Sequence, residues 1–115
     1  MNKKVIIIGS GPAAWSAAIY SARAELNPAV FTGFQIGGVR GGQLMLTTDI
    51  ENFPGFSKNI PGYELIGMME EQAKRFNISI YEEDVVSVDL SSSPFVVTGT
   101  LNSIQAESII IATGA

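Results

Sequence analysis

The sequence contains no cysteine and no histidine. Without cysteine, the chain has no disulfide scaffold, no thiolate metal site and no catalytic thiol. Without histidine, it lacks the commonest general base and metal ligand, so no Ser–His or Cys–His pair activates a nucleophile. We therefore predict neither a catalytic residue nor a metal site within these 115 residues.

Long apolar runs and clusters of positive charge are also missing. The apolar run near the N-terminus covers only residues 5–8, whereas a signal peptide needs roughly 7–15 apolar residues. No run approaches the ~20 apolar residues of a membrane span. The formal net charge is −4, and no Lys/Arg cluster offers an electrostatic footprint for nucleic acid. We predict a cytoplasmic protein that binds neither nucleic acid nor membrane.

The residues that are present predict at most one globular α/β domain. Apolar residues make up 46% of the chain and charged residues 16%, which is typical of folded chains. Short β-branched runs predict buried strands, and helical periodicity predicts helices. Strands that follow one another closely after residue 85 predict an antiparallel meander. The strands are expected at 5–8, 28–31, 78–81, 85–90, 95–100, 103–107 and 108–112, and the helices at 12–24 and 62–76.

The second helix and its surroundings carry finer predictions. One side of this helix is expected to pack against the domain, and Asn77 to end it in the left-handed conformation. The Gly-rich segment 33–61 is too long for an ordinary loop, and its aromatic residues indicate order. The acidic groups 70–71 and 82–84 are interpreted as solvated faces. The predicted packing side consists of Leu65, Met68, Met69, Gln72, Ala73 and Phe76.

The segment Gly9-Ser10-Gly11-Pro12-Ala13-Ala14 follows the first strand and opens the first helix. It fits the G-x-G-x-x-G/A pattern, in which the glycines allow a tight turn and the approach of a pyrophosphate, and the final small residue allows close helix packing. The N–H groups at the helix start would hold the anion. The alternative is an ordinary strand–helix turn. The second strand ends at Thr32 instead of the usual acidic residue, so a hydroxyl is expected at the ribose.

A second glycine motif, Ala112-Thr113-Gly114, follows the last strand. Between the two motifs stand Gly41-Gly-Gln-Leu44 and Thr47-Thr-Asp-Ile-Glu-Asn-Phe-Pro-Gly-Phe56. Together these motifs closely resemble the low-molecular-weight thioredoxin reductases of the pyridine nucleotide-disulfide oxidoreductase family. The resemblance spans essentially the whole chain and implies a Rossmann-like, three-layer FAD-binding fold, with a parallel sheet and a β-meander, that is incomplete here.

The resemblance also implies FAD contacts. Ser10, Gly11, Pro12, Ala13 and Ala14 would hold the pyrophosphate, and Thr32 and Gly33 would lie by the adenosine ribose. Gly42, Gln43, Leu44, Thr48 and Asn52 would line the flavin and ribityl side, and Val85 would contact the adenine by its backbone. Ala112, Thr113 and Gly114 would close over the cofactor, with Gly9 in the turn. For Gln43 and Asn52, the alternative is side-chain-to-backbone bonding that stabilises the loop.

In that family, residues 1–115 would be the N-terminal segment of a discontinuous FAD domain, with the NADPH domain and the C-terminal FAD segment absent. The parent protein would be a homodimeric, NADPH-dependent thioredoxin–disulfide reductase whose partner is thioredoxin. This chain alone is expected to be inactive, and to form an oligomer or a monomer of low stability. Two alternatives stay open: a dithiol-free relative such as a ferredoxin–NADP reductase, and a non-catalytic nucleotide-binding or interaction module.

Overall fold

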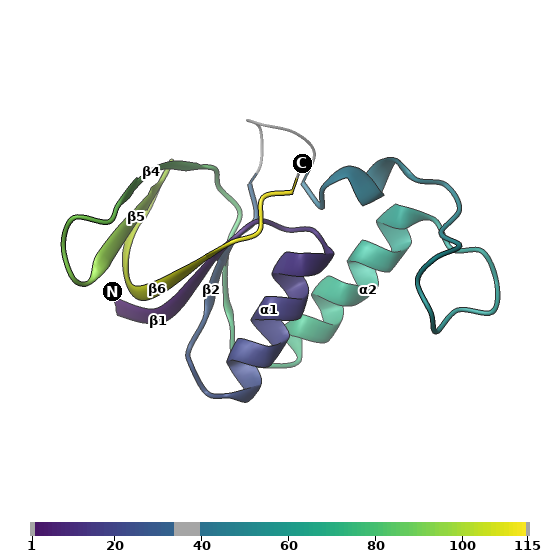
Figure 1. The fold of residues 1–115 in the computed structure, drawn as a ribbon, viewed down its shortest axis with the longest axis horizontal. Coiled ribbons are helices and arrows are strands. Elements are labelled where there is room, and N and C mark those ends of the chain that lie inside the picture. The colour runs from purple at the N-terminus through teal and green to yellow at the C-terminus, as the bar shows by residue number, and fades with distance from the viewer. Residues whose placement is uncertain (1, 34–39, 115) are drawn as a thin grey trace.

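The computed structural model describes residues 2–33 and 40–114. Over these residues the chain forms one sheet with the strand order β3-β2-β1-β6-β5-β4, accompanied by two α-helices and a short 3₁₀ helix, η1 (Figure 1). The elements in chain order are β1 (Asn2–Ile8), α1 (Pro12–Arg23), β2 (Ala29–Phe31), η1 (Gln43–Leu46), α2 (Gly62–Lys74), β3 (Ser79–Tyr81), β4 (Val85–Asp89), β5 (Phe95–Gly99) and β6 (Ser103–Ile111).

The sheet has a parallel half and an antiparallel half that share β6. β3, β2, β1 and β6 run parallel, and β4 and β5 continue from β6 as an antiparallel meander. The prediction of separate strands at 103–107 and 108–112 is wrong, because β6 is continuous. No Gly, Pro or Asn interrupts residues 103–111, so the strand leaves β5 after Ala106 and continues beside β1.

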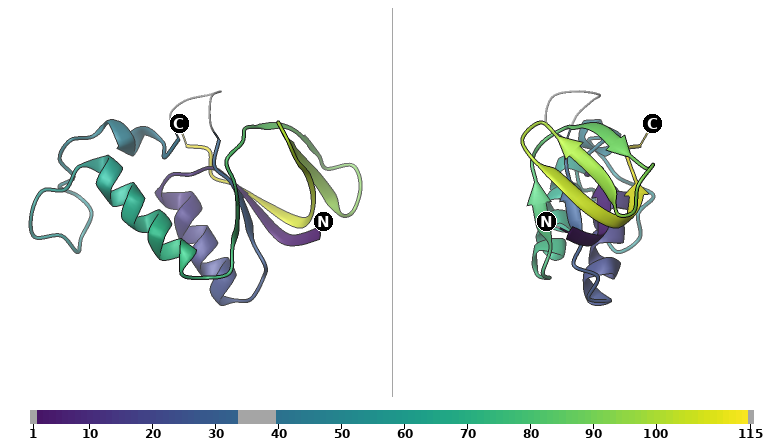
Figure 2. Two further views of the ribbon diagram at one scale, coloured as in Figure 1. Left: turned by 180° about the vertical axis from the view of Figure 1, so that it is seen from behind. Right: turned by 90° about the vertical axis from the view of Figure 1, so that its left-hand side faces the viewer.

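The chain is arranged in three layers: the two helices, the parallel strands and the meander. This arrangement confirms the predicted Rossmann-like α/β class. Val5 and Ile7 face α1 and α2, where Trp15 is the largest buried side chain of the cluster. Ile6, which points to the opposite face because strand side chains alternate, packs against Val97 of the meander. The helices therefore cover one face of the parallel strands and the meander curls over the other (Figure 2).

Helix α2 packs differently from its prediction. Leu65 and Ala73 are buried as expected, but Met68 is 46% exposed and Gln72 is exposed, while Ile66 is buried instead. The prediction for Asn77 is also wrong. Among the described non-glycine residues, Glu25 and Asn27 adopt positive φ, in the turn after α1.

The segment from residue 40 to 60 is ordered by aliphatic side chains rather than by its aromatic ones. Ile50 and Ile60 are buried against Leu65, and the N–H of Ile50 donates to the carbonyl of Ile60 at 3.0 Å. Phe53 and Phe56 form a tilted pair that remains well exposed. The predicted loop 33–61 is therefore an ordered segment where it is described, and residues 34–39 lie outside the described part of the chain.

Candidate functional site

The two glycine motifs meet at the carboxyl ends of the parallel strands. The N–H of Gly9 donates to the carbonyl of Phe31 at 2.9 Å, and the N–H of Ala112 donates to that of Ile8 at 2.8 Å. A Cβ atom built on Gly9 would lie 2.0 Å from the carbonyl oxygen of Ala112, and Gly9 adopts φ +139°. Glycine is therefore required here both for its backbone conformation and for the close approach of the two motifs.

Helix α1 begins at this edge without a side-chain cap. Gly11 is its N-cap residue, Pro12 occupies the first helical turn, and no side chain bonds the first N–H groups. The first helical backbone bond runs from the N–H of Trp15 to the carbonyl of Gly11. The N–H groups of Ala13 and Ala14 precede that bond, and such groups, together with the helix dipole, bind anions.

The loop at residues 41–42 lies against this turn. The N–H of Gly41 donates to the hydroxyl of Ser10 at 2.7 Å. A Cβ atom on Gly42, which has φ +82°, would lie 3.8 Å from the Cα of Gly11. The structure thus packs the loop at residues 41–42 against Ser10 and Gly11, beside the uncapped N–H groups of α1.

Arg40 anchors this loop to α2. Its guanidinium lies 3.0 Å from the Glu70 carboxylate and 3.4 Å from that of Glu82, and Lys74 lies 3.0 Å from Glu70. Burial raises the pKa of Glu70, but the hydrogen bonds and charges of Arg40 and Lys74 outweigh burial and lower it overall. Glu70 is therefore an ion-pair partner, and its interpretation as a solvated residue is wrong.

At the other end of the site, Thr32 and Gly33 continue from β2 toward the start of β4. The hydroxyl of Thr32 donates to backbone carbonyls, with Gly33 at 3.2 Å and Tyr81 at 3.4 Å. The N–H of Gly33 donates to the carbonyl of Glu83 at 3.1 Å. The predicted adenosine residues Thr32, Gly33 and Val85 therefore lie on two segments that are joined directly by backbone bonds.

Glu83 fixes the meander to this junction. Its buried carboxylate accepts from the N–H groups of Leu101 and Asn102 at 2.8 and 2.9 Å, and from the Asn102 side chain at 2.5 Å. Burial raises the pKa of Glu83, but these three hydrogen bonds outweigh it and lower the pKa overall. A Cβ on Gly99 would lie 2.1 Å from this carboxylate. Glu83 and Asp84 are both buried, so their prediction as a solvated face is wrong.

The remaining predicted residues are more exposed. Leu44 is half-buried in η1, whereas Gln43, Thr48 and Asn52 are exposed, as are Thr113 and Gly114 beyond β6. Neither Gln43 nor Asn52 forms a side-chain hydrogen bond within the described part of the chain, which disfavours a purely loop-stabilising role. Thr48 and Asn52 flank Ile50, whose side chain packs against Ile60 and Leu65 of α2.

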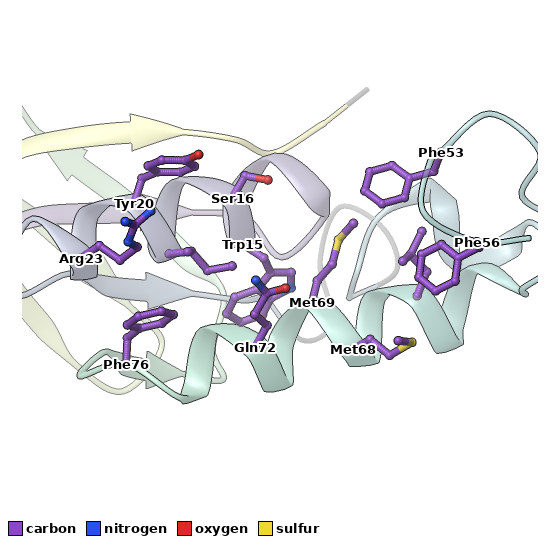
Figure 3. A pocket seen from close by; sticks show the side chains of 12 residues that line it. Trp15, Ser16, Tyr20, Arg23, Phe53, Phe56, Met68, Met69, Gln72 and Phe76 are labelled. Atoms are coloured by element: carbon purple, nitrogen blue, oxygen red, sulfur yellow. The ribbon is translucent and has the colours of Figure 1, made fainter.

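A hollow of about 490 Å³ lies between α1, α2 and residues 53–56 (Figure 3). Trp15 and Met69 lie between the two helices, and Phe53 and Phe56 approach from the loop. The indole N–H of Trp15 is buried and has no hydrogen-bond partner among the described residues. The α2 residues that line the hollow belong to the side of this helix that the sequence predicts to pack against the domain. No sequence motif indicates a hollow there.

Over residues 2–33 and 40–114, two features are absent. No helix there is long and apolar enough to cross a membrane. No group of three or more acidic, histidine or cysteine side chains there has an arrangement that could hold a metal ion.

A parallel sheet whose carboxyl ends carry a glycine turn and an uncapped helix start defines a dinucleotide-binding Rossmann-like unit. The chain belongs to the pyridine nucleotide-disulphide oxidoreductase family, which matches residues 3–115. It is 52% identical over 113 residues to NADPH-dependent thioredoxin reductase 3 of Arabidopsis thaliana, covering 98% of this chain and 21% of that protein. It is 47% identical over 114 residues to thioredoxin reductase of Chlamydia trachomatis, covering 99% of this chain and 36% of that protein.

Solved structures agree with these relatives. The thioredoxin reductase from Giardia duodenalis superposes with a TM-score of 0.90 at 37% identity, over 98% of this chain and 36% of that one. The enzyme from Streptococcus pyogenes superposes with a TM-score of 0.88 at 38% identity. The resemblance to thioredoxin reductases is confirmed, and this chain spans about a third of the length of most of these relatives.

Proposed function

We propose that this chain forms the pyrophosphate and adenosine side of an FAD site in an NADPH-dependent thioredoxin–disulfide reductase. The observation that carries the proposal is the uncapped start of α1 at Gly11, against which the loop at residues 41–42 packs without placing a side chain over it. The 52% identity to a relative named as an NADPH-dependent thioredoxin reductase supplies the reaction class. When bound, FAD would supply the electron-transfer chemistry, and the residues of this chain would bind and orient it.

We assign the cofactor-binding residues along the carboxyl ends of the parallel strands. Gly9 to Ala14 form the turn that holds the pyrophosphate, with the N–H groups of Ala13 and Ala14 as donors. Thr32, Gly33 and the backbone of Val85 hold the adenosine, and Gly42, Gln43, Leu44, Thr48 and Asn52 line the ribityl and flavin side. Ala112, Thr113 and Gly114 cover the cofactor where β6 ends. The exposed amide groups of Gln43 and Asn52 support a ligand-binding role, since they have no protein partner among the described residues.

The other parts of the reaction belong to other segments of the parent protein. The chain has no cysteine, so the redox dithiol of such a reductase would come from another segment, and we assign the NADPH site and the thioredoxin-binding surface to other segments as well. Residues 107–111 of β6 pair with β1 on one side and have no partner strand on the other among the described residues. We propose that a strand from the remaining FAD-domain segment occupies that edge, in a homodimeric cytoplasmic enzyme.

The cofactor assignment is tested by titrating the chain with FAD and following flavin fluorescence. Gly11→Val should weaken FAD binding at least tenfold. A Cβ atom at residue 11 would already lie 3.4 Å from the carbonyl oxygen of Gly41, and the two methyl groups of valine would extend further into the turn. Gly67→Val is the matched control, since Gly67 is exposed on α2 with nothing within 4 Å. Equal affinities of wild type and Gly11→Val would remove the phosphate turn from the site.

The reaction assignment is tested with NADPH, thioredoxin and dithionitrobenzoate. The 115-residue chain should consume no NADPH above the rate of free FAD. A longer protein containing this chain and a Cys-x-x-Cys pair should turn over both acceptors. A longer protein without that pair that reduces ferredoxin would favour the dithiol-free alternative, and turnover by the 115-residue chain would contradict the proposal.

A further inference from the structure

The ribose end of this site lacks its usual acid. Dinucleotide-binding units commonly place an Asp or Glu at the end of the second strand, where it accepts hydrogen bonds from the ribose hydroxyls. In this chain β2 is followed by Thr32, which is only 4% exposed. The hydroxyl of Thr32 already donates to the carbonyls of Gly33 and Tyr81. A charged acceptor for a ribose, if the site has one, comes from another segment.

Asp84 reaches this position from the connection between β3 and β4. A Cβ atom built on Gly33 would lie 3.5 Å from the Oδ1 atom of Asp84. The neighbouring Glu83 carboxylate bonds instead to the turn between β5 and β6. The carboxylate of Asp84 is therefore directed to the end of β2.

The backbone holds Asp84 in place from two sides. The carbonyl of Glu83 accepts from the N–H of Gly33, and the carbonyl of Asp84 accepts from the N–H of Thr100, both at 3.1 Å. Asp84 is 8% exposed, and Val85, the residue predicted to contact the adenine, follows it directly. Asp84 thus lies between the segments proposed to bind the ribose and the adenine.

Resting on the FAD-binding function proposed above, we propose that the Asp84 carboxylate accepts hydrogen bonds from the adenosine ribose hydroxyls. It takes the place of the acid that β2 lacks. A carboxylate offers about four acceptor positions, so it bonds a ribose in addition to its protein partners. Hydrogen bonds to an ionised acceptor are roughly twice as strong as neutral ones, which makes this residue a determinant of ribose recognition.

The experiment compares ADP with 2′,3′-dideoxy-ADP by calorimetric titration of the 115-residue chain. Wild type should bind ADP about tenfold to a hundredfold more tightly, the size of a lost hydrogen bond to a charged group. In Asp84→Asn this preference should shrink to about twofold, because only weaker neutral bonds remain. Asp89→Asn is the matched control. It replaces an exposed carboxylate on β4 that bonds, among the described residues, only Ser91, and it should keep the wild-type preference.

Two results overturn the assignment. If wild type binds ADP and 2′,3′-dideoxy-ADP with equal affinity, the assignment of Asp84 is overturned, even if Asp84→Asn fails to fold. An unchanged preference in a folded Asp84→Asn would do so directly. Wild type that binds neither ADP nor FAD would instead remove the proposed function itself, so the two failures are distinguishable.

Discussion

The parallel and antiparallel halves of the sheet share β6 but are held in different ways. β1 and β2 are buried beneath α1 and α2 on one face and beneath the meander on the other, and their carboxyl ends are joined by backbone bonds. In contrast, β4 is mostly exposed, and the end of the meander depends on the single buried carboxylate of Glu83. The parallel half therefore carries the ligand edge, while the turn between β5 and β6 is fixed to it by a polar contact, in addition to the apolar packing of Val97 on Ile6.

The difference shows where each half is sensitive to substitution. In the parallel half the critical positions are glycines, because backbones approach too closely for a Cβ atom. In the meander the critical position is a buried charge, whose removal leaves several N–H donors without an acceptor. Substituting a glycine therefore tests the parallel half, and removing the Glu83 charge tests the meander, each without changing the other.

The largest effect is expected from Gly9→Ala. The new Cβ would lie 2.0 Å from the carbonyl oxygen of Ala112, and the residue would keep an unfavourable φ of +139°. Clash and backbone strain together should cost about 3 kcal/mol of unfolding free energy, measured by urea denaturation.

Gly55→Ala separates the two contributions. Gly55 also has positive φ, +116°, but nothing lies within 4 Å of its Cβ position. It should lose only the conformational cost of about 1–2 kcal/mol. Equal losses in the two variants would mean that the contact between the glycine motifs contributes nothing.

Glu83→Gln should destabilise the chain by about 2 kcal/mol at pH 7, because a buried network loses its ionised acceptor. Since the folded pKa of Glu83 lies below its ordinary value of 4.5, its stabilisation is present above that pH and is lost as the pH falls through the folded pKa. The difference between wild type and variant should therefore shrink below about pH 4.5, as urea denaturation over a pH series would record.

Glu71→Gln is the control for this variant, since Glu71 is exposed on α2. It should match wild type at every pH within about 0.5 kcal/mol. A constant gap between Glu83→Gln and wild type from pH 7 to pH 3 would show that the Glu83 charge does not hold the meander.

The smallest effect concerns the unpaired edge where the two halves separate. Ile111 is 74% exposed beside that edge, and exposed apolar strand edges promote association. We expect self-association at micromolar concentration, and Ile111→Lys should raise its dissociation constant about tenfold, or about 1.4 kcal/mol, in sedimentation experiments. Leu101→Lys, at an 85% exposed position in the turn between β5 and β6, should leave association unchanged. Equal effects would mean that the open edge is not the association site.

The fold was largely predictable because its signals are local. The β-branched runs, the Pro12 helix start and the short meander turns each determine their own element. Residues that act over long distances were not predictable: the buried state of Glu83 depends on Leu101 and Asn102, and Arg40 meets Glu70 thirty residues later. The single strand β6 is not predictable because the end of its pairing with β5 at Ala106, while its pairing with β1 continues to Ile111, leaves no mark in the sequence.

The candidate site was predictable only in part, for the same reason. The motif located the phosphate turn, but it did not reveal that Gly9 contacts Ala112 or that Ser10 bonds Gly41. Acidic residues near one another in sequence suggested solvent exposure, although Glu83 and Asp84 are both buried, Glu83 at the turn after β5 and Asp84 near Gly33.

The central claim, that the start of α1 is the anion site, is tested most directly by titrating the ¹⁵N-labelled chain with ADP and following backbone amide shifts by NMR. The account predicts the largest shifts at the amides of Gly11, Ala13 and Ala14, with smaller shifts at Gly42 and Gly33. Shifts confined to the hollow between α1 and α2, or no shifts at millimolar ADP, would contradict it.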